Sequence, residues 1–260
     1  MFVKGKPLGS GYNCFTEESG EMMMDSGVYL LESGEEQEFF SETKESAFLL
    51  LLGNIKYTWS GNEKAAKRSS LFDEYPICLH VPRGEKVQIQ AHERTELLIQ
   101  KTTNETGFAP VFYDESNVRV QIFGDNVWNN TARRLCRDIF NYGNAPYSNM
   151  VLGELITLPG RWSSYPPHHH PQPEIYYYRF DKPQGFGCSY IGDEAFTVHE
   201  GDLSLIPGGL CHPQSAAPGY AMYYCWMIRH FPNNPWTQRI NDAAHEWLAG
   251  EHPQIWEPNI

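Results

Sequence analysis

The chain has 260 residues, a formal net charge of -12, 41% hydrophobic residues and 14% aromatic residues. This acidity argues against nonspecific nucleic-acid binding, which needs a basic surface, and no run of about 18 apolar residues is present that could cross a membrane. Residues 1–7 lack the apolar segment of a signal peptide, and the six cysteines are scattered without a Cys-x-x-Cys pair. The sequence therefore predicts a cytoplasmic protein that binds neither nucleic acid nor membrane.

In the first half, short apolar stretches alternate with turn residues. Residues 1–25 are polar and glycine-rich, and we expect an irregular lead-in or an edge strand there. Gly53 and Asn54 should separate the first two strands. We expect strands at residues 47–52, 55–60, 77–81, 86–91 and 95–101. Strands of about five or six residues with frequent turn signals predict a sandwich or barrel.

The second half repeats this pattern after a stretch of mixed character at residues 103–147. One short helix is expected at residues 242–248. We expect strands at residues 150–158, 174–180, 188–191, 195–199, 203–206 and 220–228. The sequence thus predicts an all-β fold with an N-terminal unit at residues 1–125, a connector at residues 126–149 and a C-terminal unit at residues 150–260.

A weak internal repeat supports two similar units. The pattern Pro-x-Gly-x2-Val at residues 82–87 corresponds to Pro-x-Gly-x2-His at residues 207–212. Both copies follow a short apolar stretch and precede another. The first copy has valine where the second has histidine, and the first half contains no His-x-His. If the fold is duplicated, we expect the first copy to lack a metal.

A second motif, His-x-His-x3-Glu at residues 168–174, predicts a metal site. Side chains alternate along a strand, so His168 and His170 point the same way, about 6.5 Å apart, and Glu174 keeps their parity. His212, beyond a Pro-Gly turn, supplies a fourth ligand. Imidazole and carboxylate suit a divalent transition metal, and three His with one Glu leave coordination positions open for a substrate. We expect Zn or Mn ahead of Fe, Ni or Co.

The two motifs resemble the paired motifs of the cupin superfamily. A more specific resemblance is to the 5-deoxy-glucuronate isomerase family of inositol catabolism. It is carried by Trp-Ser-Ser-Tyr-Pro-Pro-His at residues 162–168, Glu-x-Tyr-Tyr-Tyr-Arg-Phe at 174–180 and Ala-Pro-Gly-Tyr at 217–220. The resemblance covers most of residues 150–250 strongly and the first half loosely. It implies two tandem cupin barrels (double-stranded β-helix, or jelly-roll) with the metal site in the C-terminal one.

The resemblance also implies a reaction, the metal-dependent aldose–ketose isomerisation of 5-deoxy-glucuronate to 5-dehydro-2-deoxy-gluconate in myo-inositol catabolism. A proton must move between adjacent carbons through an enediolate, whose charge a metal stabilises. Alternation places Tyr176 and Tyr178 on the same side as Glu174, so they are candidates for catalytic contacts or proton relay. The sequence identifies no proton-transfer base.

The small sugar-acid substrate needs a cation for its carboxylate. Arg161, Arg179 and Arg229 are candidates, although alternation turns Arg179 away from Glu174. Tyr223, which should line the barrel, is a further candidate for substrate binding. The alternatives are another cupin enzyme (a hexuronate ketol-isomerase or a metal dioxygenase) or a sugar-acid-binding protein without catalysis. Edge strands in a two-barrel protein also leave room for a homo-oligomer.

Overall fold

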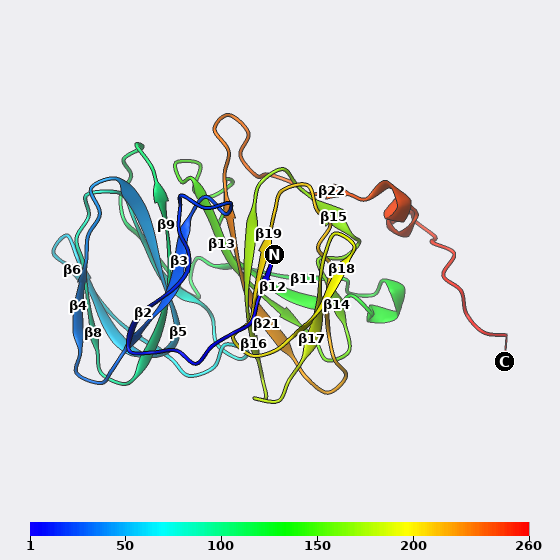
Figure 1. Cartoon of the computed structure of the whole chain (residues 1–260), viewed down its shortest axis with the longest axis horizontal. Helices are drawn as coiled ribbons and strands as arrows, with labels where there is room; N and C mark the ends of the chain where they lie inside the picture. The colour runs from blue at the N-terminus through cyan, green and yellow to red at the C-terminus, as the bar shows by residue number, and fades with distance from the viewer. Residues whose placement is uncertain (260) are drawn as a thin grey trace.

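Residues 1–259 are described by the computed structural model, in which nearly every regular element is a β-strand (Figure 1). Strands formed by residues 11–113 lie at one end of the molecule, and those formed by residues 2–3 and 119–241 lie at the other. The C-terminal tail projects away from the second unit. Within residues 1–259 no helix is long and apolar enough to cross a membrane.

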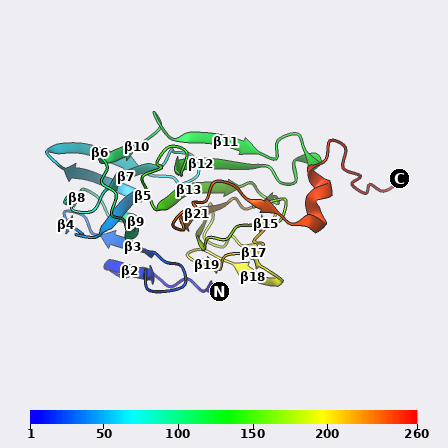
Figure 2. The same ribbon diagram turned by 90° about the horizontal axis from the view of Figure 1, so that it is seen from above.

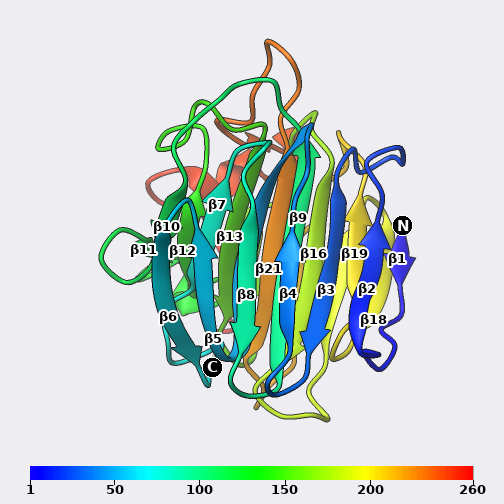
Figure 3. The ribbon, with the colours of Figure 1, turned by 90° about the vertical axis from the view of Figure 1, so that its left-hand side faces the viewer.

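The N-terminal unit is a highly twisted arrangement of nine strands, with the path β10-β7-β5-β9-β3-β2 and with β4, β6 and β8 attached through β5 and β8. Seen from this unit, its strands run in nearly the same direction as those of the C-terminal unit behind (Figure 3). The bounds are β2 Gly11–Thr16, β3 Asp25–Leu31, β4 Glu36–Phe39, β5 Lys44–Trp59, β6 Asn62–Arg68, β7 Ile77–Val81, β8 Val87–Ala91, β9 Thr95–Thr103 and β10 Val111–Tyr113.

The C-terminal unit contains a seven-stranded sheet in the order β1-β19-β16-β21-β13-β12-β11, and a four-stranded sheet in the order β14-β20-β17-β18. In the view from above, β11 to β13 lie on one side of this unit and β17 and β18 on the other (Figure 2). The bounds are β1 Phe2–Val3, β11 Arg119–Phe123, β12 Arg134–Phe140, β13 Met150–Thr157, β14 Trp162–Ser163, β15 His168–His169, β16 Glu174–Phe180, β17 Gly187–Ile191, β18 Glu194–Val198, β19 Leu203–Ile206, β20 Gln214–Ala216, β21 Met222–Arg229 and β22 Ile240–Asn241.

Two short 3-10 helices complete the described fold, η1 (Trp128–Asn130) and η2 (Ala243–Ala249). The second one confirms the helix that was expected in the tail, and Asp242 caps it by accepting from the Ala244 N–H. A short two-stranded sheet pairs β15 with β22. The C-terminal tail therefore pairs with the segment that carries His168, the first of the predicted metal ligands.

Two expected features of the strand order are wrong. The strands expected at 47–52 and 55–60 form one continuous strand, β5, which pairs with β7 and β9 before Gly53 and with β6 and β8 after it. Gly53 has a φ of 130°, and a Cβ there would lie 2.2 Å from the Thr95 hydroxyl. The glycine therefore permits a bend and a close approach of β9 rather than a turn.

The expected connector is also partly wrong, because residues 126–149 contain β12, which pairs with β13 along its length. β11 falls within the range expected for the N-terminal unit, yet it pairs with β12. The charged residues of β12 gave it the pattern of an exposed segment. In the structure Arg134 and Arg137 are both buried, and Arg137 pairs with Glu154 of β13.

The hydrophobic core has three parts. One fills the N-terminal unit, with Phe48, Ile55 and Leu97 among its members. Another fills the C-terminal unit beneath the predicted metal site. The largest joins residues of the two units, for example Leu98 and Met227. The outer face of the seven-stranded sheet is thus buried against the N-terminal strands, which leaves the opposite face to build a site.

Candidate metal centre

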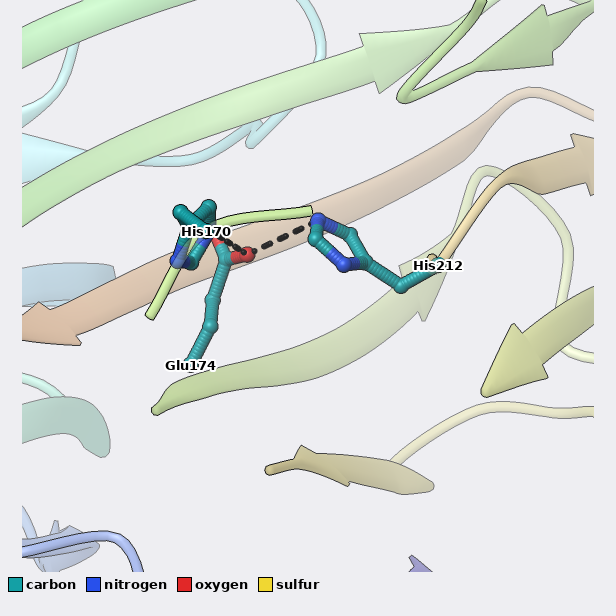
Figure 4. A group of neighbouring side chains, drawn as sticks. All are labelled: His170, Glu174 and His212. Atoms are coloured by element: carbon teal, nitrogen blue, oxygen red, sulfur yellow. Dashed lines mark hydrogen bonds and ion pairs between the residues drawn. The ribbon is translucent and has the colours of Figure 1, made fainter. Parts of the chain in front are cut away.

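Three of the four predicted ligands converge at one end of the C-terminal barrel. The potential ligand atoms of His170, Glu174 and His212 lie within 4.8 Å of one another (Figure 4). Glu174 Oε2 is 3.2 Å from His170 Nε2 and 3.2 Å from His212 Nε2, and all three residues are buried. Glu174 begins β16, whereas His212 follows the turn after β19, so two adjacent strands of the sheet bring the group together.

Main-chain hydrogen bonds orient the three imidazoles. Nδ1 of His168, of His170 and of His212 lies 2.8–3.0 Å from a carbonyl oxygen two residues away in the chain. A carbonyl only accepts, so each Nδ1 carries the hydrogen, and Nε2 of the neutral ring keeps its lone pair. This is how metal-binding histidines are held in many proteins.

The charges of this group fit a cation. Burial would raise the pKa of the Glu174 carboxyl, but His170 and His212 lower it to about 2, so the carboxylate is ionised at neutral pH. The buried Nε2 of His212 has no hydrogen-bond donor facing it. Lone pairs and a carboxylate therefore point at one another, an arrangement that a divalent transition metal stabilises. The His and Glu cluster and the cupin architecture together indicate metal binding.

His168 lies beside this group. Its ring centroid is 5.0 Å from that of His212, and it faces the same cavity, although its nitrogens fall outside the 4.8 Å group. Burial, followed by the influence of His212, lowers the pKa of His168 to about 3. The ring is therefore neutral at physiological pH, as a ligand must be. Its role as the fourth ligand stays a prediction.

The ligands open into a cavity of about 540 Å³, within the usual range for small-molecule sites. Much of its wall is aromatic. Tyr176 comes from β16, Tyr224 and Trp226 come from β21, and Trp236 comes from the loop that follows β21. The Trp236 ring lies 6.1 Å from that of His170, and the Gln172 side chain ties this loop down by donating to the Asn234 carbonyl at 2.7 Å.

The two predicted catalytic tyrosines have different surroundings. Tyr176 lines the cavity, its ring centroid lies 5.9 Å from that of His212, and its hydroxyl is 3.0 Å from Ser164 Oγ. Tyr178 points to the same side but lies deeper in the barrel, where it is fully buried. Its hydroxyl donates to Gln214 Oε1 at 2.7 Å and lies 2.9 Å from the Ser204 hydroxyl, which can donate to it. The structure therefore places Tyr176 at the site and Tyr178 in the core.

Two predicted substrate-binding arginines, Arg179 and Arg229, contact the N-terminal unit instead of the cavity. Arg179 Nη1 lies 2.5 Å from Glu96 Oε2, and Arg229 Nε donates to Thr102 Oγ1 at 2.7 Å. The alternation argument against Arg179 is thus confirmed, because β16 turns this residue toward the face that packs on the other unit. That partner, 83 residues away in the chain, could not be inferred from local sequence.

Neither of the other two candidates lines the cavity. The hydroxyl of Tyr223 donates to Glu154 at 2.8 Å in the buried contact between the units. Arg161 lies in the turn before β14, where its carbonyl accepts from the Ala216 N–H. The cavity does contain two arginines that the sequence argument missed, Arg134 and Arg239. One lay in the supposed connector and the other in the tail, and only the unrecognised strand pairings of β12 and β22 would have revealed them.

The architecture and the cluster define the class of protein, a two-barrel cupin with a metal-type site in the C-terminal barrel. Solved structures agree. An IolB-like protein from Salmonella typhimurium LT2 superimposes with a TM-score of 0.86 at 20% identity, over 96% of this chain and 100% of that one. An oxalate decarboxylase from Lactobacillus farciminis gives a TM-score of 0.64 at 11% identity, over 92% of this chain and 86% of that one. At these identities the likeness shows the fold alone.

A sequence model of the KduI/IolB family matches residues 5–248, and the chain belongs to this family. One relative, named 5-deoxy-glucuronate isomerase, from Geobacillus thermodenitrificans (strain NG80-2), is 29% identical over 250 residues, which is 89% of this chain and 88% of that protein. Another of the same name, from Lacticaseibacillus casei, is 29% identical over 227 residues, 80% of each chain. The resemblance and the fold class expected from the sequence are confirmed.

Proposed function

We propose that the protein is a metal-dependent isomerase that converts 5-deoxy-glucuronate to 5-dehydro-2-deoxy-gluconate in myo-inositol catabolism. The observation that carries the proposal is the convergence of His170, Glu174 and His212 at a cavity of sugar size. The names of relatives that match most of the chain supply the substrate. The six cysteines are free in the structure, which supports a cytoplasmic, reducing setting.

His168, His170, Glu174 and His212 would hold the metal, and Zn or Mn is favoured ahead of Fe, Ni or Co. When bound, the metal acts as a Lewis acid toward the carbonyl and hydroxyl oxygens of the substrate. Aldose–ketose isomerisation moves one hydrogen from C2 to C1 and one from the C2 hydroxyl to the C1 oxygen. The protein must therefore exchange protons with oxygen atoms as well as with carbon.

Tyr176 is the hydroxyl best placed for the oxygen step. Burial raises the pKa of Tyr176 well above its ordinary value, and Glu174 raises it further, so the phenol stays protonated and donates. Ser164 Oγ bridges it to the Tyr224 hydroxyl, at 3.0 Å and 3.2 Å, and Tyr224 contacts Ser163 Oγ at 3.0 Å. Each hydroxyl both donates and accepts, so this chain can return a proton to Tyr176 after it has given one up.

Turnover of 5-deoxy-glucuronate, followed by NMR on metal-stripped and reconstituted protein, tests the proposal. We expect chelation to abolish turnover and one divalent ion to restore it. His168→Ala and His212→Ala should bind less metal, whereas the control His199→Ala, an exposed histidine outside the cavity, should bind as much as the unmodified protein. Unchanged metal content in both ligand variants, or chelator-resistant turnover, would contradict the proposal. A requirement for molecular oxygen would indicate a dioxygenase instead.

A further inference from the structure

We propose that Arg134 and Arg239 form the subsite for the substrate's carboxylate, so that the cavity selects sugar acids over neutral sugars. The inference rests on the proposed function and specifies how that site recognises its substrate. Both residues line the cavity that holds the metal-type cluster, Arg134 from β12 and Arg239 from the residue just before β22.

Arg134 is a buried cation without a buried anion. Its side chain is only 4% exposed, and its guanidinium donates to two neutral carbonyls, those of Ala132 at 2.9 Å and Tyr165 at 3.0 Å. The other buried arginines among residues 1–259, Arg68 and Arg137, both pair with Glu154. A guanidinium has five N–H donors, so three remain for a ligand. Burying an unpaired charge is costly, which points to an anion that arrives with the ligand.

Arg239 adds a second positive charge to the same cavity. In the described part of the chain neither Arg134 nor Arg239 forms an ion pair with a carboxylate. Burial lowers the pKa of Arg134, the Tyr224 hydroxyl raises it, and the charge of Arg239 in the same cavity lowers it. An anion placed between them would relieve this repulsion and accept planar, bidentate hydrogen bonds.

The backbone holds Arg239 in place through the metal-binding segment. β22 pairs with β15 so that Asn241 lies opposite His168, and the Asp242 N–H donates to the Pro167 carbonyl at 2.9 Å. Arg239 therefore lies two residues from a position tied to a predicted metal ligand. Its side chain belongs to an exposed segment at the rim, where an entering ligand can reach it.

The cavity offers a separate partner for each end of 5-deoxy-glucuronate, whose carboxylate and aldehyde lie at opposite ends of a six-carbon chain. Tyr176 and Tyr224 line the same cavity as the two arginines, His170 and Glu174, and their ring centroids lie 4.4 Å apart. Burial raises the pKa of Tyr224 and hydrogen bonds with Ser163 and Ser164 lower it, while the charge of Arg134 lowers it and that of Glu174 raises it. The aldehyde end can thus face the metal while the carboxylate faces the arginines.

The local positive charge has a clear role in a protein whose formal net charge is -12. Such a protein repels anions on average, and the pair of cations offsets this inside the cavity, whose lining also carries the carboxylates of Asp138 and Glu174. A neutral sugar of the same size would leave both guanidinium groups unpaired. Sites built around an ionic partner reject analogues that lack it, so this pair determines specificity.

The test compares Arg239→Gln and Arg134→Lys with the control Arg133→Gln, whose guanidinium pairs with Asp125 at 2.7 Å and does not line the cavity. Calorimetry measures the Kd of the metal-loaded protein for D-glucuronate and for D-glucose, and kinetics give KM and kcat for 5-deoxy-glucuronate. We expect each cavity variant to raise the Kd for glucuronate and the KM about 10- to 100-fold, with Kd for glucose and all values of the control changed by less than about twofold.

Unchanged glucuronate affinity in both cavity variants would overturn the proposal, as would an equal loss of glucose affinity or a wild-type protein that does not bind glucuronate. Arg134 is buried, so if Arg134→Lys unfolds, the exposed Arg239→Gln decides. Failure of the proposed function gives a different result: no turnover of 5-deoxy-glucuronate by the wild type. The glucuronate titration still decides in that case, because loss of affinity in Arg239→Gln alone, with Arg133→Gln unaffected, supports the subsite.

Discussion

Replacing Glu154 with glutamine should destabilise the whole protein, because this carboxylate neutralises two buried arginines between the units. Glu154 is fully buried and accepts from Arg68 at 2.6 Å and 2.8 Å, from Arg137 at 3.3 Å and from the Tyr223 hydroxyl at 2.8 Å. Burial would lower the pKa of Arg68, but Glu154 raises it above its ordinary value. Arg68 thus stays charged, and both arginines depend on one anion.

Breaking a buried ion pair by removing one partner costs about 3–5 kcal/mol, a large share of the roughly 5–15 kcal/mol by which domains are stable. Glu154→Gln leaves both arginines without a counter-charge and turns an amide N–H₂ toward their donors, so we expect the upper part of that range. Arg68→Met should cost less, because Glu154 then keeps Arg137. Glu154→Gln should therefore lose more free energy of unfolding than Arg68→Met, because the carboxylate is shared by two arginines.

Urea unfolding followed by tryptophan fluorescence and circular dichroism measures both losses. Asp125→Asn provides the matched control, because it removes an ion pair with Arg133 at 2.7 Å in which the side chains are 46% and 39% exposed. Exposed pairs contribute at most about 1 kcal/mol, so this variant should unfold almost as the wild type does. If Glu154→Gln lost no more free energy of unfolding than Asp125→Asn, the neutralising role of Glu154 would be refuted.

Two further predictions concern the site. Tyr176→Phe should lower kcat/KM about 100-fold or more with little change in Tm. Tyr178→Phe should instead cost about 1–3 kcal/mol of stability and leave kcat/KM nearly unchanged. The reverse pattern would show that the two roles are exchanged. In metal-free protein, the folded-state pKa of His168 is about 3 against an ordinary 6.5, and that of Glu174 is about 2 against 4.5. Between its folded-state and its ordinary pKa, each group is protonated in the unfolded chain but not in the folded one, so the free energy of unfolding should fall as the pH falls from 6.5 toward 3. A urea midpoint that stays constant between pH 7 and pH 4 would contradict this.

The local sequence pattern was sufficient to predict the position of strands whose two faces differ in polarity or whose ends carry turn residues. The predicted strands at 77–81, 174–180 and 203–206 coincide with β7, β16 and β19. The same parity argument brought Glu174 and Tyr176 to one side of β16, and the structure has both at the cavity. These features depend on alternation along a few residues, which the sequence states directly.

Features that depend on distant partners could not be predicted in this way. β12 carries three charged positions among seven, and it is a buried strand because Glu154 of another strand neutralises Arg137. Arg134 was missed because it lies on the same unrecognised strand. The tail gave no periodic signal, yet β22 pairs with β15 and brings Arg239 to the cavity. Whether a charged side chain is buried depends on the residue that it contacts in the fold, and the local composition does not identify that residue.

Side chains of β13 and β21 face the cavity and the N-terminal unit in alternation, so the unit without a His and Glu cluster packs directly behind the wall of the unit that has one. Among residues 1–259 the only such cluster lies in the C-terminal unit. Leu155, Tyr224 and Trp226 face the cavity, and each is followed or preceded along its strand by a residue that faces the N-terminal unit, such as Glu154 or Tyr223. Movement of the cavity wall would therefore disturb the contact between the units. The N-terminal unit is thus packed against the strands that carry Tyr224 and Trp226.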